Sequence, residues 1–166
     1  SADGESNRVR MIQRLAEASG AQGMCIGQAL DIEAENRSVT LEELEEVHRN
    51  KTGALMKSAI RLGALAAGEK AFEVMPQLDK YADAIGLAFQ VQDDILDIIS
   101  DTETLGKPQG SDQDLNKSTY PSLLGLEGAQ EKAQTLLQEA LQALAAIPYN
   151  TQLLEEFARY VIERKN

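Results

Sequence analysis

Three aspartates lie within one of the most apolar segments of the chain, residues 81–99. The order Asp93, Asp94 and Asp97 places the three carboxylates within about 100° of one another on one helix face. Like charges at this spacing repel unless a cation lies between them. Carboxylates in an apolar setting must be paired, protonated or bound to metal. Because hard oxygen ligands suit Mg²⁺, the pattern predicts a magnesium site, although a solvated acidic face has the same spacing.

Basic side chains that could meet a bound anion occur in two further segments. Lys107 and Lys117 lie in the polar stretch that follows the aspartates, and Lys51 begins a Lys-Thr-Gly tripeptide between apolar helical stretches. Taken singly, each of these lysines is an ordinary surface residue. Together with the carboxylates they indicate a phosphate site bridged by metal, since Mg²⁺ commonly binds through a few carboxylates and the phosphate oxygens of a substrate.

These side chains must be positioned by helices, because the periodicity shows no strand. Thr40 and Glu43 form a capping box, and we expect a loop from Ser100 to Ser118, which contains three Gly or Pro residues and little apolar content. An irregularity is expected near residues 51–53. The predicted helices cover residues 7–19, 21–35, 40–67, 71–99, 119–126, 129–146 and 151–163. The expected fold class is therefore all-α, a helical bundle in a single unit, residues 1–166.

Composition excludes several functions. The formal net charge of −11 argues against nucleic-acid binding. One cysteine cannot form an internal disulfide or a zinc site, and the single histidine has no catalytic-triad pattern around it. No apolar run is long enough for a membrane span, and the first residues do not resemble a signal peptide. We expect a cytoplasmic protein.

Four segments resemble the trans-isoprenyl diphosphate synthases, most closely the bacterial farnesyl diphosphate synthases (geranyltranstransferases). They are GQALDIEAE (27–35), HRNKTGAL (48–55), GLAFQVQDDILD (86–97) and TLGKPQGSDQDLNKSTYPSLLGLEGA (104–129). The residues at 160–165 also resemble the ending of that family. The segments occur in the family's order across nearly the whole chain, and their combination is specific although each one alone is weak.

The resemblance implies an all-α isoprenoid synthase fold with a central cavity. Asp93, Asp94 and Asp97 match the second of two aspartate-rich motifs, which hold Mg²⁺ against the diphosphate of an allylic substrate. The matching basic residues around that diphosphate are Lys51, Lys107 and Lys117. Thr52, Phe89 and Gln90 match residues near the reacting ends of the substrates, and Gln28 and Asp31 match a helix that lines the cavity. The implied catalytic set is Lys51, Thr52, Gln90 and Lys107.

The implied reaction is the Mg²⁺-dependent condensation of dimethylallyl or geranyl diphosphate with isopentenyl diphosphate to give farnesyl diphosphate, in an enzyme that is a homodimer at full length. One departure is large, because the first aspartate-rich motif and the basic cluster for isopentenyl diphosphate have no counterpart in this chain. We therefore expect the C-terminal part of a polyprenyl synthase domain, inactive alone and able to self-associate. The alternatives are a non-catalytic helical subunit, a truncated remnant or, less consistent with the DDxxD motif, a class I terpene cyclase.

Overall fold

A computed structural model describes residues 2–105 and 118–164, and every regular element in these ranges is a helix. The all-α prediction is confirmed. The helices are α1 (Ala2–Ser19), α2 (Met24–Ala34), α3 (Leu41–His48), the π-helical turn η1 (Arg49–Gly53), α4 (Ala54–Ala67), α5 (Glu69–Glu73), α6 (Met75–Leu105), α7 (Tyr120–Ala145) and α8 (Gln152–Glu163).

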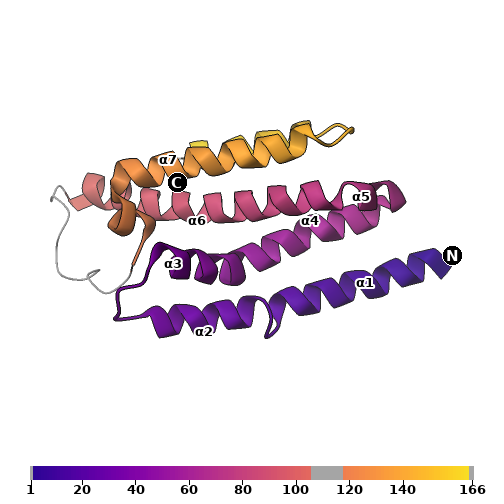
Figure 1. Cartoon of the computed structure of the whole chain (residues 1–166), viewed down its shortest axis with the longest axis horizontal. Helices are drawn as coiled ribbons and strands as arrows, with labels where there is room; N and C mark the ends of the chain where they lie inside the picture. The colour runs from indigo at the N-terminus through magenta and orange to yellow at the C-terminus, as the bar shows by residue number, and fades with distance from the viewer. Residues whose placement is uncertain (1, 106–117, 165–166) are drawn as a thin grey trace.

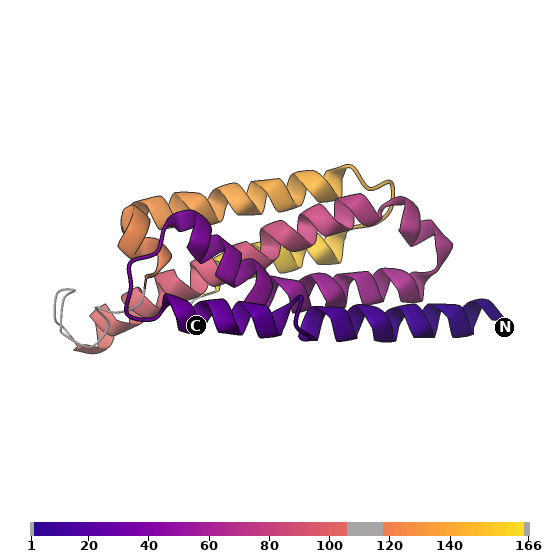
Figure 2. The same ribbon diagram turned by 60° about the horizontal axis from the view of Figure 1, so that its bottom comes forward.

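The long helix α6 lies at the centre of the bundle (Figure 1). Helix α7 runs along one side of it, and α4 packs between α6 and α1 on the other side (Figure 2). Helix α8 packs against both α6 and α7. The core sits where these helices meet, and Tyr81, Ile85 and Val91 of α6 are fully buried there together with Tyr120 and Leu144 of α7.

Two helix boundaries differ from the sequence prediction. Helix α6 continues to Leu105, so the prediction of a loop beginning at Ser100 was wrong. Residues 100–104 are polar, but residues 100–105 contain no Gly or Pro, and polarity alone does not end a helix. Helix α1 begins at Ala2 rather than at residue 7, so the helix also includes the polar residues that precede the first apolar positions. The rest of the predicted loop, with Lys107 and Lys117, lies outside the described residues.

Other local predictions are confirmed by backbone contacts. Thr40 Oγ1 accepts from the Glu43 amide at 3.2 Å, and Glu43 Oε2 accepts from the Thr40 amide at 2.8 Å, which completes the capping box. The predicted break between the helices at 119–126 and 129–146 is a kink inside α7 at Gly125, where φ is 74°. A side chain is strained at this φ, and glycine is not.

Large apolar side chains remain exposed on α1 and α2, which form the outer layer at the lower edge of Figure 1. Val9 and Ile12 are 65% and 69% exposed, and Ile32 of α2 is 57% exposed. These side chains lack the cover that the core gives to α6. Among the described helices, none combines the length and the apolar character needed to cross a membrane.

Candidate functional site

The π-helical turn η1 places Lys51 and Thr52 where two other helices approach its backbone closely. A Cβ built on Gly27 of α2 would lie 2.1 Å from the Lys51 nitrogen, and one on Gly86 of α6 would lie 3.3 Å from the Gly53 Cα. Only glycine permits the first contact. The irregularity predicted near residues 51–53 is thus a π turn, a feature that often occurs at functional sites.

A row of hydrogen bonds connects η1 with the first aspartate of α6. Thr52 Oγ1 donates to Gln90 Oε1 at 3.2 Å, and Gln90 Nε2 donates to Asp93 Oδ2 at 3.2 Å. The structure therefore brings together three residues that the sequence analysis selected. The Gln90 side-chain amide accepts a hydrogen bond from Thr52 through its oxygen and donates one to Asp93 through its nitrogen. It therefore orients the Asp93 carboxylate.

Arg164, directly after α8, is a site residue that the sequence analysis missed. Its Nη2 donates to Asp93 Oδ1 and to the Phe89 carbonyl oxygen, the latter at 3.3 Å. The guanidinium also lies over the Phe89 ring, 4.1 Å from its centroid, in a cation–π contact. The Arg164 side chain is only 13% exposed, compared with 39% for Asp93. A basic residue in the segment 160–165, which resembles the family's ending, was the available signal.

The other two aspartates of the motif face different surroundings. Asp94 Oδ2 accepts from the Tyr120 amide at 2.9 Å and so points toward α7, whereas Asp97 is exposed. Among the described residues, no three acidic, histidine or cysteine side chains lie close enough together to hold a metal. Asp93 and Asp97, one helical turn apart, nevertheless fit Mg²⁺, which often takes only one or two protein carboxylates and completes its shell with water and phosphate.

Lys51 lies beside this row but is engaged by α2. Its Nζ is 2.5 Å from Asp31 Oδ2, and the two side chains are 33% and 14% exposed. The sequence analysis placed Asp31 on a helix that lines a cavity. The structure shows that its carboxylate pairs with Lys51. Gln28, the other residue predicted on that helix, is exposed.

Behind the aspartates, Tyr120 is held neutral by its surroundings. Burial raises the pKa of its phenol well above the usual value, and the nearby carboxylates of Glu45 and Asp94 raise that pKa further. The Tyr120 ring stacks on the buried His48 ring with centroids 5.6 Å apart. Asp94 therefore lies on a packed side of α6, whereas Asp97 lies on an exposed side.

The chain is similar to known proteins over almost its whole length. A family profile described as polyprenyl synthetase matches residues 3–156. The chain belongs to the polyprenyl synthetase family. Farnesyl diphosphate synthase of Escherichia coli is 56% identical over 163 residues, which are 96% of this chain and 54% of that protein. The synthase of Geobacillus stearothermophilus is 47% identical over 156 residues, 90% of this chain and 52% of that protein.

Solved structures of family members have the same fold. The geranyltransferase of Helicobacter pylori, in complex with magnesium and isoprenyl diphosphate, is 37% identical with a TM-score of 0.77; the match covers 95% of this chain and 51% of that one. The geranyltransferase of Legionella pneumophila is 29% identical with the same TM-score and covers 97% and 51%. The chain thus spans about half the length of the polyprenyl synthetases that it matches.

Proposed function

We propose that this chain forms the metal and diphosphate side of a prenyltransferase that makes farnesyl diphosphate. The reaction joins an allylic diphosphate, dimethylallyl or geranyl, to isopentenyl diphosphate. The observation that carries the proposal is the row Thr52–Gln90–Asp93, which connects the turn that contains Lys51 with the first aspartate of the predicted metal set. Matched synthases such as that of Escherichia coli support the product.

The proposed roles of Asp93, Asp97, Lys51 and Phe89 follow from their positions, and those of Lys107 and Lys117 from the resemblance alone. Asp93 and Asp97 would hold Mg²⁺, which supplies positive charge to the diphosphate as it leaves, and Asp94 would support them from its bond with the Tyr120 amide. Lys51 adds a second positive charge on the η1 side. Phe89 and the apolar wall of α6 exclude water from the allylic cation, which water would otherwise quench. Lys107 and Lys117 complete the proposed set of diphosphate-binding residues.

We further propose that the chain is the C-terminal part of a polyprenyl synthase domain and needs a partner to turn over. The exposed Val9, Ile12 and Ile32 support both self-association and a homodimer of the longer enzyme. The alternative, a non-catalytic helical subunit or remnant, has one observation in its favour: Asp93 is already neutralised by Arg164.

Calorimetry with inorganic diphosphate and Mg²⁺ tests the proposed site. We expect the chain to bind diphosphate only when Mg²⁺ is present, and Asp93→Asn to weaken this binding at least tenfold. Asp83→Asn is the matched control on the same helix, since Asp83 pairs with Lys57 at 2.7 Å and lies away from the site. Equal diphosphate affinities for the two variants, or a diphosphate affinity that does not depend on Mg²⁺, would refute the proposal.

A turnover assay separates the enzyme from the non-catalytic alternative. The chain alone should form no farnesyl diphosphate from geranyl and isopentenyl diphosphates. A longer synthase that contains this chain should form it, and should lose that activity with Asp93→Asn. A longer protein that remains inactive while still binding Mg²⁺ and diphosphate would favour the non-catalytic subunit.

A further inference from the structure

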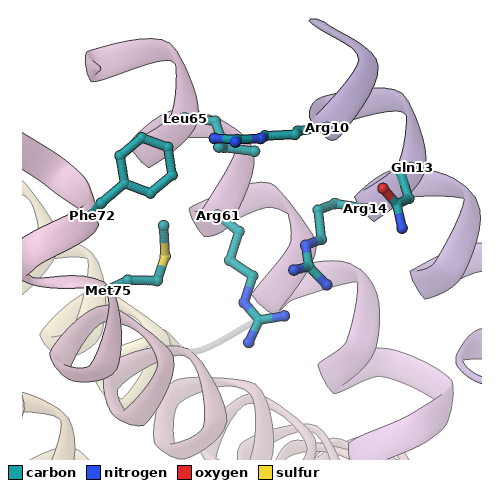
Figure 3. Close-up of a pocket in the computed structure, with 7 residues that line it drawn as sticks. All are labelled: Arg10, Gln13, Arg14, Arg61, Leu65, Phe72 and Met75. Atoms are coloured by element: carbon teal, nitrogen blue, oxygen red, sulfur yellow. The ribbon is translucent and has the colours of Figure 1, made fainter. Parts of the chain in front are cut away.

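A pocket of about 360 Å³ opens at the other end of α6, between α1, α4 and α5 (Figure 3). Its volume lies in the range of small-molecule sites. It contacts α6 at Met75, and the rise of about 1.5 Å per residue puts Asp93 roughly 27 Å farther along that helix. The pocket is therefore separate from the proposed diphosphate site. The residues that line it are Arg10, Gln13, Arg14, Arg61, Leu65 and Phe72, with Met75.

The inner part of this pocket is apolar. Leu65 is only 6% exposed, and Met75 packs against the core. Phe72 of α5 stands at the edge of the pocket with 37% of its surface exposed. Together these three side chains offer a hydrocarbon or an aromatic group a surface on which it would leave water.

The rim of the pocket is positively charged, although the chain as a whole carries a net charge of −11. Three of its eight arginines are here. Arg10 and Arg14 are one helical turn apart, so both face the pocket from α1. Figure 3 shows Arg10 extended toward Phe72 above Leu65, and its guanidinium lies 5.9 Å from the Phe72 ring centroid.

The partners of these arginines differ in a way that matters for binding. Both carboxylate oxygens of Asp79 hold Arg61, at 2.7 and 2.8 Å. Arg14 pairs with Glu17 at 3.0 Å, and both side chains are about half exposed, so that pair is weak. Within the described part of the chain, Arg10 makes no ion pair with a carboxylate. Arg10 and Arg14 are thus available to an incoming anion, and Arg61 is not.

We propose that this pocket binds an amphiphilic anion, a phosphorylated apolar chain whose head lies on Arg10 and Arg14 and whose chain lies on Leu65, Phe72 and Met75. Guanidinium groups bind phosphate oxygens through paired charge-assisted hydrogen bonds. Prenyl phosphates have this chemistry. The site uses none of the residues of the proposed reaction, and its function would stand if that reaction were wrong.

Binding of geranyl phosphate in buffer that contains EDTA tests the pocket without the metal site. We expect saturable binding in the wild type and a loss of about tenfold or more in the double variant Arg10→Gln/Arg14→Gln, since two charge-assisted hydrogen bonds are removed. The control, Arg8→Gln/Arg159→Gln, removes the same charge from exposed positions outside the pocket and should change the affinity less than twofold. Circular dichroism verifies that each variant is folded.

Four further measurements identify the ligand and the place where it binds. Phe72→Ala should weaken geranyl phosphate and leave inorganic phosphate unchanged, and geraniol should bind more weakly than geranyl phosphate. Asp93→Asn should have no effect in EDTA. The proposal is overturned if the two double variants behave alike, if Asp93→Asn abolishes binding, or if no saturable binding occurs up to about 1 mM, a free energy near −4 kcal/mol. Binding only to phosphatidylglycerol vesicles would overturn it in favour of a membrane surface.

Discussion

Helix α6 carries an Arg–Asp pair near each end, and the two pairs are built differently. At the pocket end, Arg61 reaches from α4 and engages both oxygens of Asp79. At the other end, Arg164 engages one oxygen of Asp93, while Gln90 holds the other. The first pair joins two long helices. The second pair joins Arg164, which follows α8, to Asp93. The neighbour of Asp93 one turn along α6, Asp97, is exposed.

This difference separates a structural ion pair from one that can be exchanged. The hydrogen bond with Asp79 raises the pKa of Arg61, while partial burial opposes the rise. Asp79 is 24% exposed and binds a single guanidinium through both oxygens, whereas Asp93 is 39% exposed and its two oxygens bind different partners. Asp93 lies one turn from the exposed Asp97, so Mg²⁺ could replace the guanidinium of Arg164 there. In the proposed function, Arg164 is the counterion of Asp93 until Mg²⁺ binds.

Replacing each aspartate should separate the two pairs most clearly. In an active synthase that contains this chain, Asp93→Asn should lower kcat/KM roughly a hundredfold or more, because it removes a group that stabilises developing charge. Asp79→Asn should lower thermal stability with little change in kcat/KM. Steady-state kinetics and calorimetric unfolding measure both effects. A larger kinetic loss for Asp79→Asn would reverse the assignment of the two pairs.

Glycine substitutions should show that the two ends also differ in backbone packing. Gly27→Ala forces a Cβ to within 2.1 Å of the Lys51 nitrogen and should cost about 2 kcal/mol or more in unfolding free energy. Gly63→Ala in α4 is the control, since nothing lies within 4 Å of its Cβ position, and it should stabilise by roughly 0.5–1 kcal/mol. Denaturant unfolding checks both values, and equal effects would contradict the close packing at η1.

Tyr81, between the two ends, should make stability fall at alkaline pH. Burial raises its pKa to about 12, and its hydroxyl donates to the Leu154 carbonyl at 2.9 Å. The unfolded phenol titrates near 10, so this contribution is complete below about pH 10 and is lost as pH rises toward 12, at a cost of about 1 kcal/mol near pH 11. Tyr81→Phe should remove that part of the pH dependence, and an unchanged profile would contradict the burial effect.

The smallest expected effect concerns the replacement of Arg164 by a metal ion as the partner of Asp93. Arg164→Gln should raise the Mg²⁺ affinity of the chain roughly threefold, because a partly exposed ion pair is worth up to about 1 kcal/mol. Arg61→Gln should leave that affinity unchanged. Electron paramagnetic resonance with Mn²⁺ as the probe measures both. If Arg164→Gln weakens binding, Arg164 supports the metal site and does not compete with it.

Much of the fold follows from local signals in the sequence. The capping box at Thr40, the irregularity at Lys51 and the break at Gly125 depend on residues close together in the chain, and the structure confirms all three. The loop predicted from Ser100 was wrong because low apolar content was taken as a helix end, although residues 100–105 contain no Gly or Pro.

Tertiary contacts account for what the sequence could not predict about the site. The direction of Asp94 is set by the Tyr120 amide, and the partner of Asp93 comes from Arg164, 71 residues away. The helical angle of about 100° between Asp93 and Asp94 already placed them at opposite edges of the acidic face. The arginine pocket had only one sequence signal, the spacing of Arg10 and Arg14.

The π turn η1 also has a rotational consequence for the helices on either side of it. A π turn contains one residue more than an α turn, so removing one residue from Arg49–Gly53 would leave an uninterrupted α-helix. That helix would be rotated by about 100° beyond the deletion. Leu44 of α3 and Leu65 of α4, both now buried, would then face different directions. The extra residue therefore sets the phase between the two buried faces, and a chain one residue shorter could bury only one of them.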